Sequence, residues 1–493
     1  MIVMNKFTST RDLNNNKTAS EAILKGLAED GGLFTPDLSK IEKFDLNDLL
    51  GLDYKSLAIK ILSRILDDYS EEEITDAINR AYDNKFDCTD TVGLVKKGDI
   101  NVLELYHGPT CAFKDMALTV LPHLLTTAYK KKGEHKIISI LTATSGDTGK
   151  AALEGFKDVE NTFITVFYPK ENVSKVQERQ MLTTGGKNTC VVKVDGNFDD
   201  CQRIVKAAFD DKKINSLENT ELSSANSINL GRLVPQIVYY FYAYLKLVER
   251  KEIKMGEKIS FAVPSGNFGD ILAGYIGKVL GLPVNKLICA SNRNNVLTDF
   301  INTGVYDSLR PFYSTISPSM DILVSSNVER LLYILSDYDS ATVKGYMDEL
   351  KKSGKYKVSE KIFKAIKDNF VAYAFDDETT SRTIKDLYQN TGKVIDPHTS
   401  VAYAACLAYK KDNNEKVVCL STASPYKFAK DVCKAITDKK FDDDFMYLKE
   451  LEKIGDEKIP YSLENLENLK INHDNEINKE DGMDFILGKL EKL

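Results

Sequence analysis

The stretch His107-Gly-Pro-Thr-Cys-Ala-Phe-Lys114-Asp115 marks a change from strand to helix around a single lysine. Before it, residues 100–106 alternate apolar and polar side chains as a β-strand does, and the Gly-Pro pair ends that pattern. After it, the apolar residues from Met116 to Leu125 fit a buried helix, in which Pro122 is expected to cause a kink. The sequence therefore places Lys114 where a helix begins directly after a strand.

Lys114 is the first candidate for chemistry. Lysine side chains usually lie along a surface with the ammonium group in water. Burial beside Ala112, Phe113 and Met116 would instead lower the pKa of the lysine and provide the neutral amine that a Schiff base with a carbonyl compound requires. A solvent-exposed lysine in the first helical turn is the commoner case, and it stays open as the alternative.

Strand and helix patterns alternate from residue 100 to about residue 292, which is typical of α/β layers with a mostly parallel sheet. The further strand-like runs are residues 136–141, 162–168, 189–194, 258–263, 286–290 and a short strand from about residue 416. The longest helical pattern, residues 230–250, is rich in Tyr and Phe that we expect in the core. Ligands of such folds bind at the loops that follow the carboxyl ends of strands.

Three other parts of the chain lack this alternation. Residues 1–97 read as a mainly helical N-terminal domain, in which Ser70 and Glu73 form a capping box before a helix. Residues 294–392 read as a mainly helical insertion, and residues 439–493 as a charged, helical C-terminal tail on the surface. At 493 residues, the chain is expected to form two or three domains.

The first of three loops rich in glycine or serine is Thr142-Ala-Thr-Ser-Gly-Asp-Thr-Gly-Lys150. It offers backbone N–H groups, hydroxyls and a helix N-terminus, which suit a carboxylate or a phosphate. Its end resembles a P-loop, but Thr144 stands where glycine is needed and Ala151 replaces the hydroxyl residue that would bind magnesium. The sequence therefore excludes a P-loop.

The second loop, Val263-Pro-Ser-Gly-Asn-Phe-Gly-Asp270, has two glycines that let the backbone approach an anion closely. The following helix adds about 0.3–2 kcal/mol toward binding that anion, and Asp270 is unfavourable there unless it caps the helix or points away. The third loop, Cys419-Leu-Ser-Thr-Ala-Ser-Pro-Tyr-Lys-Phe428, carries hydroxyls that could bond a ring nitrogen. An ordinary glycine turn and a Ser/Thr helix cap are the plain alternatives for these two loops.

Composition excludes several classes of function. The net charge of -7 and the pI near 5.6 leave no basic surface for nucleic acid. The eight cysteines and five histidines are dispersed without a Cys-x-x-Cys pair, which argues against a disulfide framework and a metal site. No apolar run is long enough to cross a membrane and the first residues lack a signal peptide, so we expect a cytoplasmic protein.

The order of these motifs is more specific than any one loop. A strand-to-helix lysine followed by the three loops resembles the pyridoxal-phosphate (PLP) enzymes of the tryptophan-synthase-β fold type. Further motifs resemble the threonine synthase family, in its longer branch from bacteria and fungi, over about residues 9–430. These motifs are Ser9-Thr-Arg11, Glu29-Asp-Gly-Gly-Leu33, Ala225-Asn-Ser-Ile-Asn229 with Arg232, Pro318-Ser-Met-Asp-Ile322, Ser326-Asn-Val-Glu-Arg330 and Asp396-Pro-His-Thr399. Ser424, where the family commonly has His, and Leu230, where it commonly has Trp, depart from the pattern.

The resemblance implies an α/β fold of two open, mostly parallel twisted sheets flanked by helices, known as PLP fold type II. The catalytic core would span residues 98–438, with a smaller, mobile lobe at about residues 133–230. Lys114 would be the catalytic residue that binds pyridoxal 5'-phosphate as a Schiff base, and Thr422 would hydrogen-bond the pyridine nitrogen. The other implied cofactor contacts are Gly266, Asn267, Phe268, Gly269 and Asp270. The implied substrate contacts are Ser145, Asp147, Thr148, Gly149, Asn226, Ser227 and Arg232.

The implied reaction converts O-phospho-L-homoserine and water to L-threonine and phosphate by γ-elimination and β-addition, the last step of threonine biosynthesis. A threonine or serine dehydratase with the same cofactor is the nearest alternative, and it would not need a second phosphate site. A catalytically silent binding protein with the same fold is the other alternative. We expect a monomer, with a dimer as the second possibility.

Overall fold

Two open sheets form the centre of the computed structural model, which describes residues 4–133, 136–144, 146–171 and 173–493. The larger sheet has the strand order β14 (Phe370–Ala374), β11 (Val284–Ser291), β10 (Ile259–Pro264), β15 (Val417–Ser421), β5 (Ile100–Glu104) and β4 (Gly93–Lys97). The smaller sheet has the order β16 (Asn475–Asn478), β8 (Thr189–Asp195), β7 (Thr162–Pro169), β6 (Ile137–Ala143) and β9 (Thr220–Ser223). Only β4 pairs antiparallel among these described strands. The predicted class of two mostly parallel sheets is confirmed.

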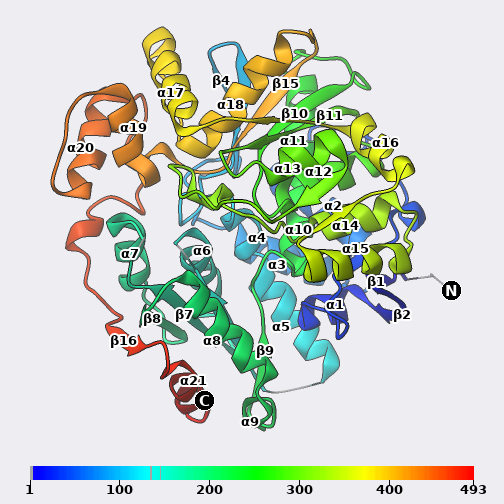
Figure 1. Cartoon of the computed structure of the whole chain (residues 1–493), viewed down its shortest axis with the longest axis vertical. Helices are drawn as coiled ribbons and strands as arrows, with labels where there is room; N and C mark the ends of the chain where they lie inside the picture. The colour runs from blue at the N-terminus through cyan, green and yellow to red at the C-terminus, as the bar shows by residue number, and fades with distance from the viewer. Residues whose placement is uncertain (1–3, 134–135, 145, 172) are drawn as a thin grey trace.

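Helices surround both sheets, and the smaller sheet lies below the larger one in Figure 1. The helices of the larger lobe and the N-terminal region are α1 (Ala19–Lys25), α2 (Tyr54–Ile65), α3 (Glu71–Ala81), α4 (Asp115–Leu118), α5 (Leu121–Lys132), α10 (Leu230–Leu233), α11 (Ile237–Glu249), α12 (Gly269–Val279), α13 (Val296–Thr303), α14 (Val328–Leu335), α15 (Ser340–Ser353), α16 (Glu360–Asn369), α17 (Asp377–Thr391), α18 (Pro397–Lys410) and α19 (Ala429–Ile436). The smaller lobe has α6 (Asp147–Phe156), α7 (Lys175–Leu182), α8 (Phe198–Asp210) and α9 (Lys212–Asn215), and the C-terminal segment has α20 (Asp444–Ile454) and α21 (Gly482–Leu490). Short 3-10 turns are η1 (Leu38–Lys40), η2 (Val234–Gln236), η3 (Pro318–Met320), η4 (Pro425–Phe428) and η5 (Leu466–Asn468).

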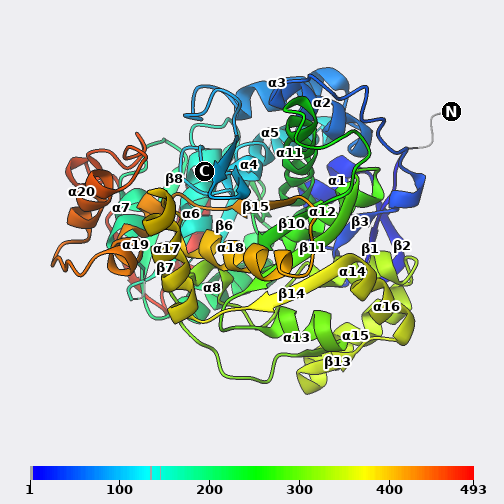
Figure 2. The same cartoon turned by 90° about the horizontal axis from the view of Figure 1, so that it is seen from above.

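The larger sheet is covered on both faces. Figure 2 shows α18 on one side of the strands, with α11 and α12 on the other. Helix α18 packs against β10, β11 and β15, and α12 packs against β10 and β11. Every residue of β10 is buried as a result, which explains why its sequence is apolar at every position except Ser260 instead of alternating.

Three neighbouring parallel strands bring the predicted loops together. Strands β10, β15 and β5 lie side by side, so the loops after their carboxyl ends meet at one edge of the larger sheet. The backbone N–H of Phe113 donates to the carbonyl of Thr422 at 2.8 Å, and Ala112 and Ala423 form an isolated bridge. These contacts hold Lys114 directly beside the third loop.

The N-terminal region contains a small sheet that the sequence did not reveal. Strands β1 (Phe7–Ser9), β2 (Asp12–Lys17) and β3 (Phe34–Pro36) form an antiparallel sheet beside the predicted helices. Two of these strands have only three residues, and the third is polar except for Leu13, so the sequence pattern did not identify them. The predicted capping box of Ser70 and Glu73 is confirmed at the start of α3.

The single helix predicted over residues 230–250 is wrong. The chain instead forms α10, the 3-10 turn η2 and α11, with Pro235 in the first turn of η2. Proline lacks an N–H group and its ring collides with the preceding helical turn, so a straight helix cannot pass through this position. The aromatic residues of α11 are buried as predicted.

The insertion also contains strands. Within residues 294–392, β14 extends the larger sheet at its edge, and β12 (Val305–Asp307) pairs with β13 (Lys355–Lys357) as an antiparallel ladder. Helices form the rest of this regular structure. The insertion is therefore partly integrated into the larger sheet.

The C-terminal segment links the two lobes. Helix α20 packs on α19 of the larger lobe, whereas β16 pairs with β8 and α21 packs on α8. Figure 1 shows this part of the chain, coloured orange to red, running along one edge from α20 to β16 and α21. Between them, Arg179 of α7 donates to the backbone carbonyls of Leu466, Glu467 and Leu469 at 3.2, 2.8 and 2.7 Å. The segment is thus more than the surface tail that was predicted.

Arg179→Met is expected to lower the free energy of unfolding by about 1–3 kcal/mol, because three carbonyls lose a charged donor. Hydrogen exchange of residues 466–478 should accelerate more than that of the large-sheet strands. Arg203→Met on α8 is the matched control, since its ion pair with Asp200 is exposed and should contribute no more than about 0.5 kcal/mol. Unchanged exchange in residues 466–478 of the Arg179 variant would show that this arginine does not anchor the segment.

Candidate functional site

Lys114 lies at the N-terminus of α4, and only 12% of its side chain is exposed. Its Nζ lies 3.3 Å from Asp147 Oδ2 and 3.4 Å from Ser319 Oγ. Burial lowers the pKa of Lys114 below its usual value and outweighs the Asp147 carboxylate, which acts in the opposite direction. The structure therefore favours the buried lysine over the exposed one.

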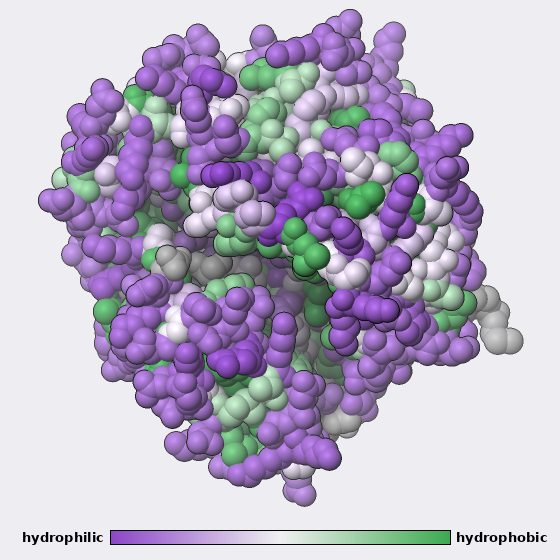
Figure 3. All heavy atoms as spheres, in the orientation of Figure 1, coloured by the Kyte–Doolittle hydropathy of each residue, from purple (hydrophilic) through white to green (hydrophobic). Residues whose placement is uncertain are grey.

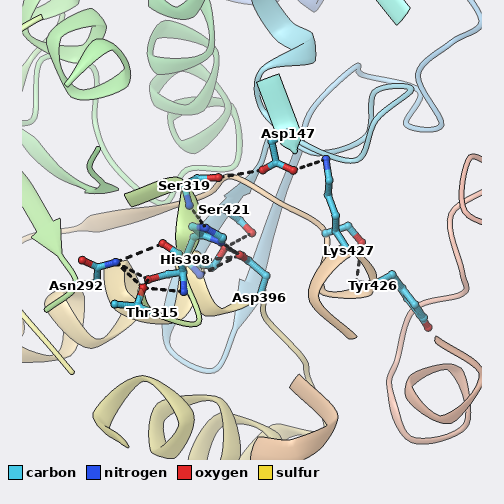
Figure 4. Close-up of polar contacts among 12 residues, drawn as sticks. Asp147, Asn292, Thr315, Ser319, Asp396, His398, Ser421, Tyr426 and Lys427 are labelled. Atoms are coloured by element: carbon cyan, nitrogen blue, oxygen red, sulfur yellow. Dashed lines mark hydrogen bonds and ion pairs between the residues drawn. The ribbon is translucent and has the colours of Figure 1, made fainter. Parts of the chain in front are cut away.

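Asp147 begins α6 and reaches across from the smaller lobe to the larger one, as Figure 4 shows. Its Oδ1 accepts from Lys427 Nζ at 2.8 Å and from Gln177 Nε2 at 2.7 Å, and its Oδ2 accepts from Ser319 Oγ at 3.0 Å. Burial would raise the pKa of Asp147, but the ammonium groups of Lys427 and Lys114 hold it well below its usual value. A carboxylate in this state binds cations, so its side chain is unsuited to a substrate anion.

The second loop forms a cradle of free backbone donors. No described acceptor takes a hydrogen bond from the N–H groups of residues 266–270. Phe268 has a φ of 63° in the left-handed region, and a Cβ on Gly266 would lie 2.7 Å from the carbonyl oxygen of Ser319. Free N–H groups at the start of α12 make this loop a site for a phosphate or another anion.

Asp270 points away from that cradle. The hydroxyls of Tyr239 and Tyr240 donate to its Oδ1 at 2.6 and 2.9 Å. Burial raises the pKa of Asp270 to about 6, although both tyrosine hydrogen bonds lower it. Only the backbone of Asp270 can therefore contribute to anion binding, and the predicted conflict between two negative charges does not arise.

Arg232 is a buried cation without a described carboxylate partner. It is 4% exposed, its Nη1 donates to the carbonyl of Ala225 at 2.7 Å, and its Nε is buried without a partner in the described chain. Burial lowers the pKa of its guanidinium to about 10. Because a desolvated cation is costly unless paired, this environment favours an anionic ligand.

The segment that contains Asn226 and Ser227 joins Arg232 to the cradle. Ala225, which accepts the hydrogen bond from Arg232, directly precedes both residues. The side-chain amide of Asn327 donates to the carbonyls of Ser227 at 3.2 Å and Asn267 at 3.1 Å. The predicted substrate segment and the predicted cofactor loop are thus bound to the same side chain.

The remaining predicted residues have different surroundings. Thr422 is 7% exposed, and its hydroxyl makes no hydrogen bond within the described chain. The N–H of Gly149 already donates to Thr144 Oγ1 at 2.9 Å, so Gly149 mainly closes the turn. Thr148 is half-buried in the first turn of α6, and Ser145 lies outside the described residues.

Several residues of the site were not assigned a role from the sequence. Lys427, Gln177 and Ser319 all contact Asp147. His398 Nδ1 lies 2.6 Å from Asp396 Oδ2, and its Nε2 accepts from the N–H of Ser319 at 3.2 Å (Figure 4). Four of these residues, Lys427, Ser319, Asp396 and His398, lie in motifs that resemble those of the family and could have been found from them, whereas no motif contains Gln177.

Lys150 is excluded from the site by its contacts. Its Nζ is 2.5 Å from Glu154 Oε1 and 2.7 Å from Thr184 Oγ1, within the smaller lobe.

Figure 3 shows the surface hollowed along the boundary between the two lobes. Within the described residues, no helix could span a membrane and no group of three or more His, Cys, Asp or Glu side chains could hold a metal ion.

Comparisons with known proteins agree across almost the whole chain. Family models described as "Threonine synthase N terminus", "Pyridoxal-phosphate dependent enzyme" and "Threonine synthase, C-terminal" match residues 6–82, 96–423 and 399–473. The threonine synthases of Saccharomyces cerevisiae and Pseudomonas aeruginosa each share 39% sequence identity with this chain. Each alignment covers 87% of this chain, and the two cover 89% and 90% of the yeast and Pseudomonas proteins, respectively. Crystal structures of PLP-bound threonine synthase from Brucella melitensis and of the yeast enzyme superpose with TM-scores of 0.88 and 0.89, at 35% identity over 99% of both chains.

Proposed function

Because the chain belongs to the threonine synthase family, we propose that Lys114 binds pyridoxal 5'-phosphate and moves the protons in the conversion of O-phospho-L-homoserine to L-threonine. The enzyme is a PLP-dependent lyase of threonine biosynthesis. The main support for this role of Lys114 is its buried amine. Burial lowers the pKa of that amine, which lies at the edge of the larger sheet where three loops meet.

The residues present fit the cofactor. The free N–H groups of residues 266–270 would hold its phosphate, and the Thr422 hydroxyl would bond its ring nitrogen. When bound, pyridoxal phosphate supplies an electron sink for the reacting carbon atoms of the substrate. A neutral hydroxyl at the ring nitrogen, instead of a carboxylate, suits elimination and replacement better than transamination.

A second anion site is needed for the substrate phosphate. We assign it to Arg232, with Asn226, Ser227 and Thr148 as further donors, because the Arg232 guanidinium is buried and lacks a described carboxylate partner. Ser145 completes the proposed set near the substrate carboxylate, and Gly149 supports the set by closing the turn. Asp147 would instead orient Lys114 and Lys427.

Lys114 is placed to act as base and acid. Its neutral amine would remove the Cα proton of the substrate and assist loss of a Cβ proton, so that phosphate leaves from Cγ and water adds at Cβ. Closure of the lobe that carries Asp147 would exclude bulk water during these steps. The buried contacts of Asp147 with Ser319 and Lys427 are available for such closure.

The decisive assay compares two reactions of the purified protein. Release of phosphate from O-phospho-L-homoserine, with equal formation of threonine, is expected. Efficient release of ketobutyrate from threonine would instead indicate a dehydratase. Binding of phosphohomoserine without conversion would indicate the catalytically silent binding protein. The intact cluster around Lys114 argues against this alternative.

Thr422→Val is expected to weaken cofactor binding by about 0.5–1.5 kcal/mol, the net contribution of one neutral hydrogen bond. The dissociation constant of the cofactor, measured by equilibrium titration of its absorbance, would rise about 2–12-fold. Thr148→Val is the control, because its hydroxyl is assigned to the substrate. An unchanged dissociation constant in Thr422→Val would remove this hydroxyl from the cofactor site.

We also propose a cytoplasmic location and a monomeric state, with a dimer as the alternative. All eight cysteines are free, and seven of them are buried, which suits a reducing compartment. Light scattering of the purified protein would establish its mass in solution.

A further inference from the structure

Lys427 is a second buried lysine next to the proposed catalytic one. Its side chain is fully buried, and its Nζ donates to Asp147 Oδ1 at 2.8 Å and to the carbonyl oxygen of Thr110 at 2.9 Å. A buried ammonium group is tolerated only where such acceptors surround it. The family resemblance assigned no role to this residue.

The two partners of Lys427 belong to different parts of the site. Thr110 lies in the loop that leads to Lys114, and Asp147 begins α6 of the smaller lobe. Lys427 itself lies in η4, which forms the end of the third loop, the loop that also contains Thr422. One ammonium group therefore connects the catalytic loop, the cofactor loop and the smaller lobe.

The carboxylate of Asp147 is shared unequally between two lysines. Lys427 is at 2.8 Å from Oδ1, whereas Lys114 is at 3.3 Å from Oδ2, an oxygen that also accepts from Ser319. The shorter contact carries the larger share of the attraction. Lys114 is consequently only weakly paired with Asp147, because Lys427 is the closer partner of that carboxylate.

We propose that Lys427 is a positioning residue that holds Asp147 against the larger lobe and takes most of its charge, so that the Lys114 nitrogen can lose its proton. This inference rests on the proposed role of Lys114. This role of Lys427 explains how the Asp147 carboxylate can lie in a site that must bind anions. Its negative charge is balanced by Lys427 and Lys114.

The charges around Lys114 support this assignment. Besides Asp147, the charged groups that act on Lys114 are Lys427 from η4 and Arg232 from α10, and both lower its pKa. His398 from α18 acts on Asp147. Without Lys427, Asp147 would stabilise the protonated Lys114 nitrogen more strongly and one repelling cation would be lost, so both changes would raise the pKa.

The test is a titration of the cofactor-loaded protein, followed by its visible absorbance over a series of pH values. In Lys427→Met the midpoint assigned to the Lys114 nitrogen should rise by about one pH unit or more, which at a fixed pH is a tenfold change in the ratio of deprotonated to protonated forms. In the double variant Lys427→Met/Asp147→Asn the midpoint should fall to the parental value or below, because the counter-ion is absent. Lys427→Arg, which keeps the cation, should stay near the parent.

Lys150→Met is the matched control, since Lys150 is also buried in an ion pair but bonds Glu154. Its midpoint should equal that of the parent. A parental midpoint in Lys427→Met, or the same shift in the double variant, would overturn the inference. If Lys427→Met does not fold, Asp147→Asn alone must lower the midpoint, and an unchanged value would overturn it equally. A parent that shows no cofactor absorbance would instead contradict the proposed function.

Discussion

Lys114→Ala is expected to reduce threonine formation by about 10⁴-fold, the upper end of the range for a positioned acid-base group. The loss should be that large because the same side chain also provides the attachment of the cofactor. The fold should survive, since the Lys114 side chain makes two long hydrogen bonds within the described chain and its removal relieves the desolvation of an amine. Phosphate release from phosphohomoserine measures the first effect, and thermal unfolding measures the second.

Lys130→Ala is the control for this substitution. Lys130 is an exposed lysine on α5, so its loss should change neither activity nor stability appreciably. Full activity of Lys114→Ala would remove this residue from the chemistry. Loss of activity together with unfolding would show that the lysine has a structural role instead.

Arg232→Met is expected to lower kcat/KM for phosphohomoserine on the order of 10²–10³-fold, the typical loss when one donor to developing charge is removed. Its stability should be unchanged or higher. The guanidinium is buried, one of its nitrogens has no partner within the described chain, and apolar replacement of such a group is often neutral or stabilising by about 1–4 kcal/mol. Activity and stability should therefore change in opposite directions.

Arg330→Met is the control for Arg232→Met, because Arg330 is a buried arginine with hydrogen-bond partners. Arg330 is also fully buried, and burial lowers the pKa of its guanidinium to about 10 as well. It donates to the carbonyls of Phe34 and Ile228 and to the side-chain oxygen of Asn327, so its loss should cost at least about 2 kcal/mol. Equal destabilisation by both substitutions, with full activity in Arg232→Met, would make Arg232 a structural residue.

Inorganic phosphate provides an independent measurement of the same site. It should compete with phosphohomoserine in the parent and compete much less in Arg232→Met. Homoserine should be a very poor substrate of the parent, because donors arranged for a phosphate remain unpaired when it is absent.

Seven of the eleven strands in the two sheets could be predicted, because parallel strands buried on both faces are mainly apolar runs, as in β10 and β7. The loops after them follow from the rule that ligands bind at carboxyl ends of strands. Strands β1 and β16 could not be predicted, because they are short or polar and are defined only by their partners. Apolar periodicity alone predicts one helix over residues 230–250, because that pattern does not register the proline at position 235.

The candidate site divides in the same way. Lys114 and the cradle of residues 266–270 depend on local sequence, so their motifs reveal them. The cluster of Asp147, Gln177 and Lys427 depends on tertiary contacts, one between α6 and α7 of the smaller lobe and one between the two lobes. In this cluster the Asp147 carboxylate is already paired with two lysines. We therefore propose that Asp147, which the sequence analysis predicted as a substrate ligand, is a positioning group.

Three lysines near the two anion loops make the attachment site the most direct test of the central claim. The cofactor-loaded protein would be reduced with borohydride, digested and mapped by mass spectrometry. The pyridoxyl group should be found on Lys114 alone. Finding it on Lys427, which is buried against Asp147, or on Lys150, which is paired with Glu154, would contradict the account.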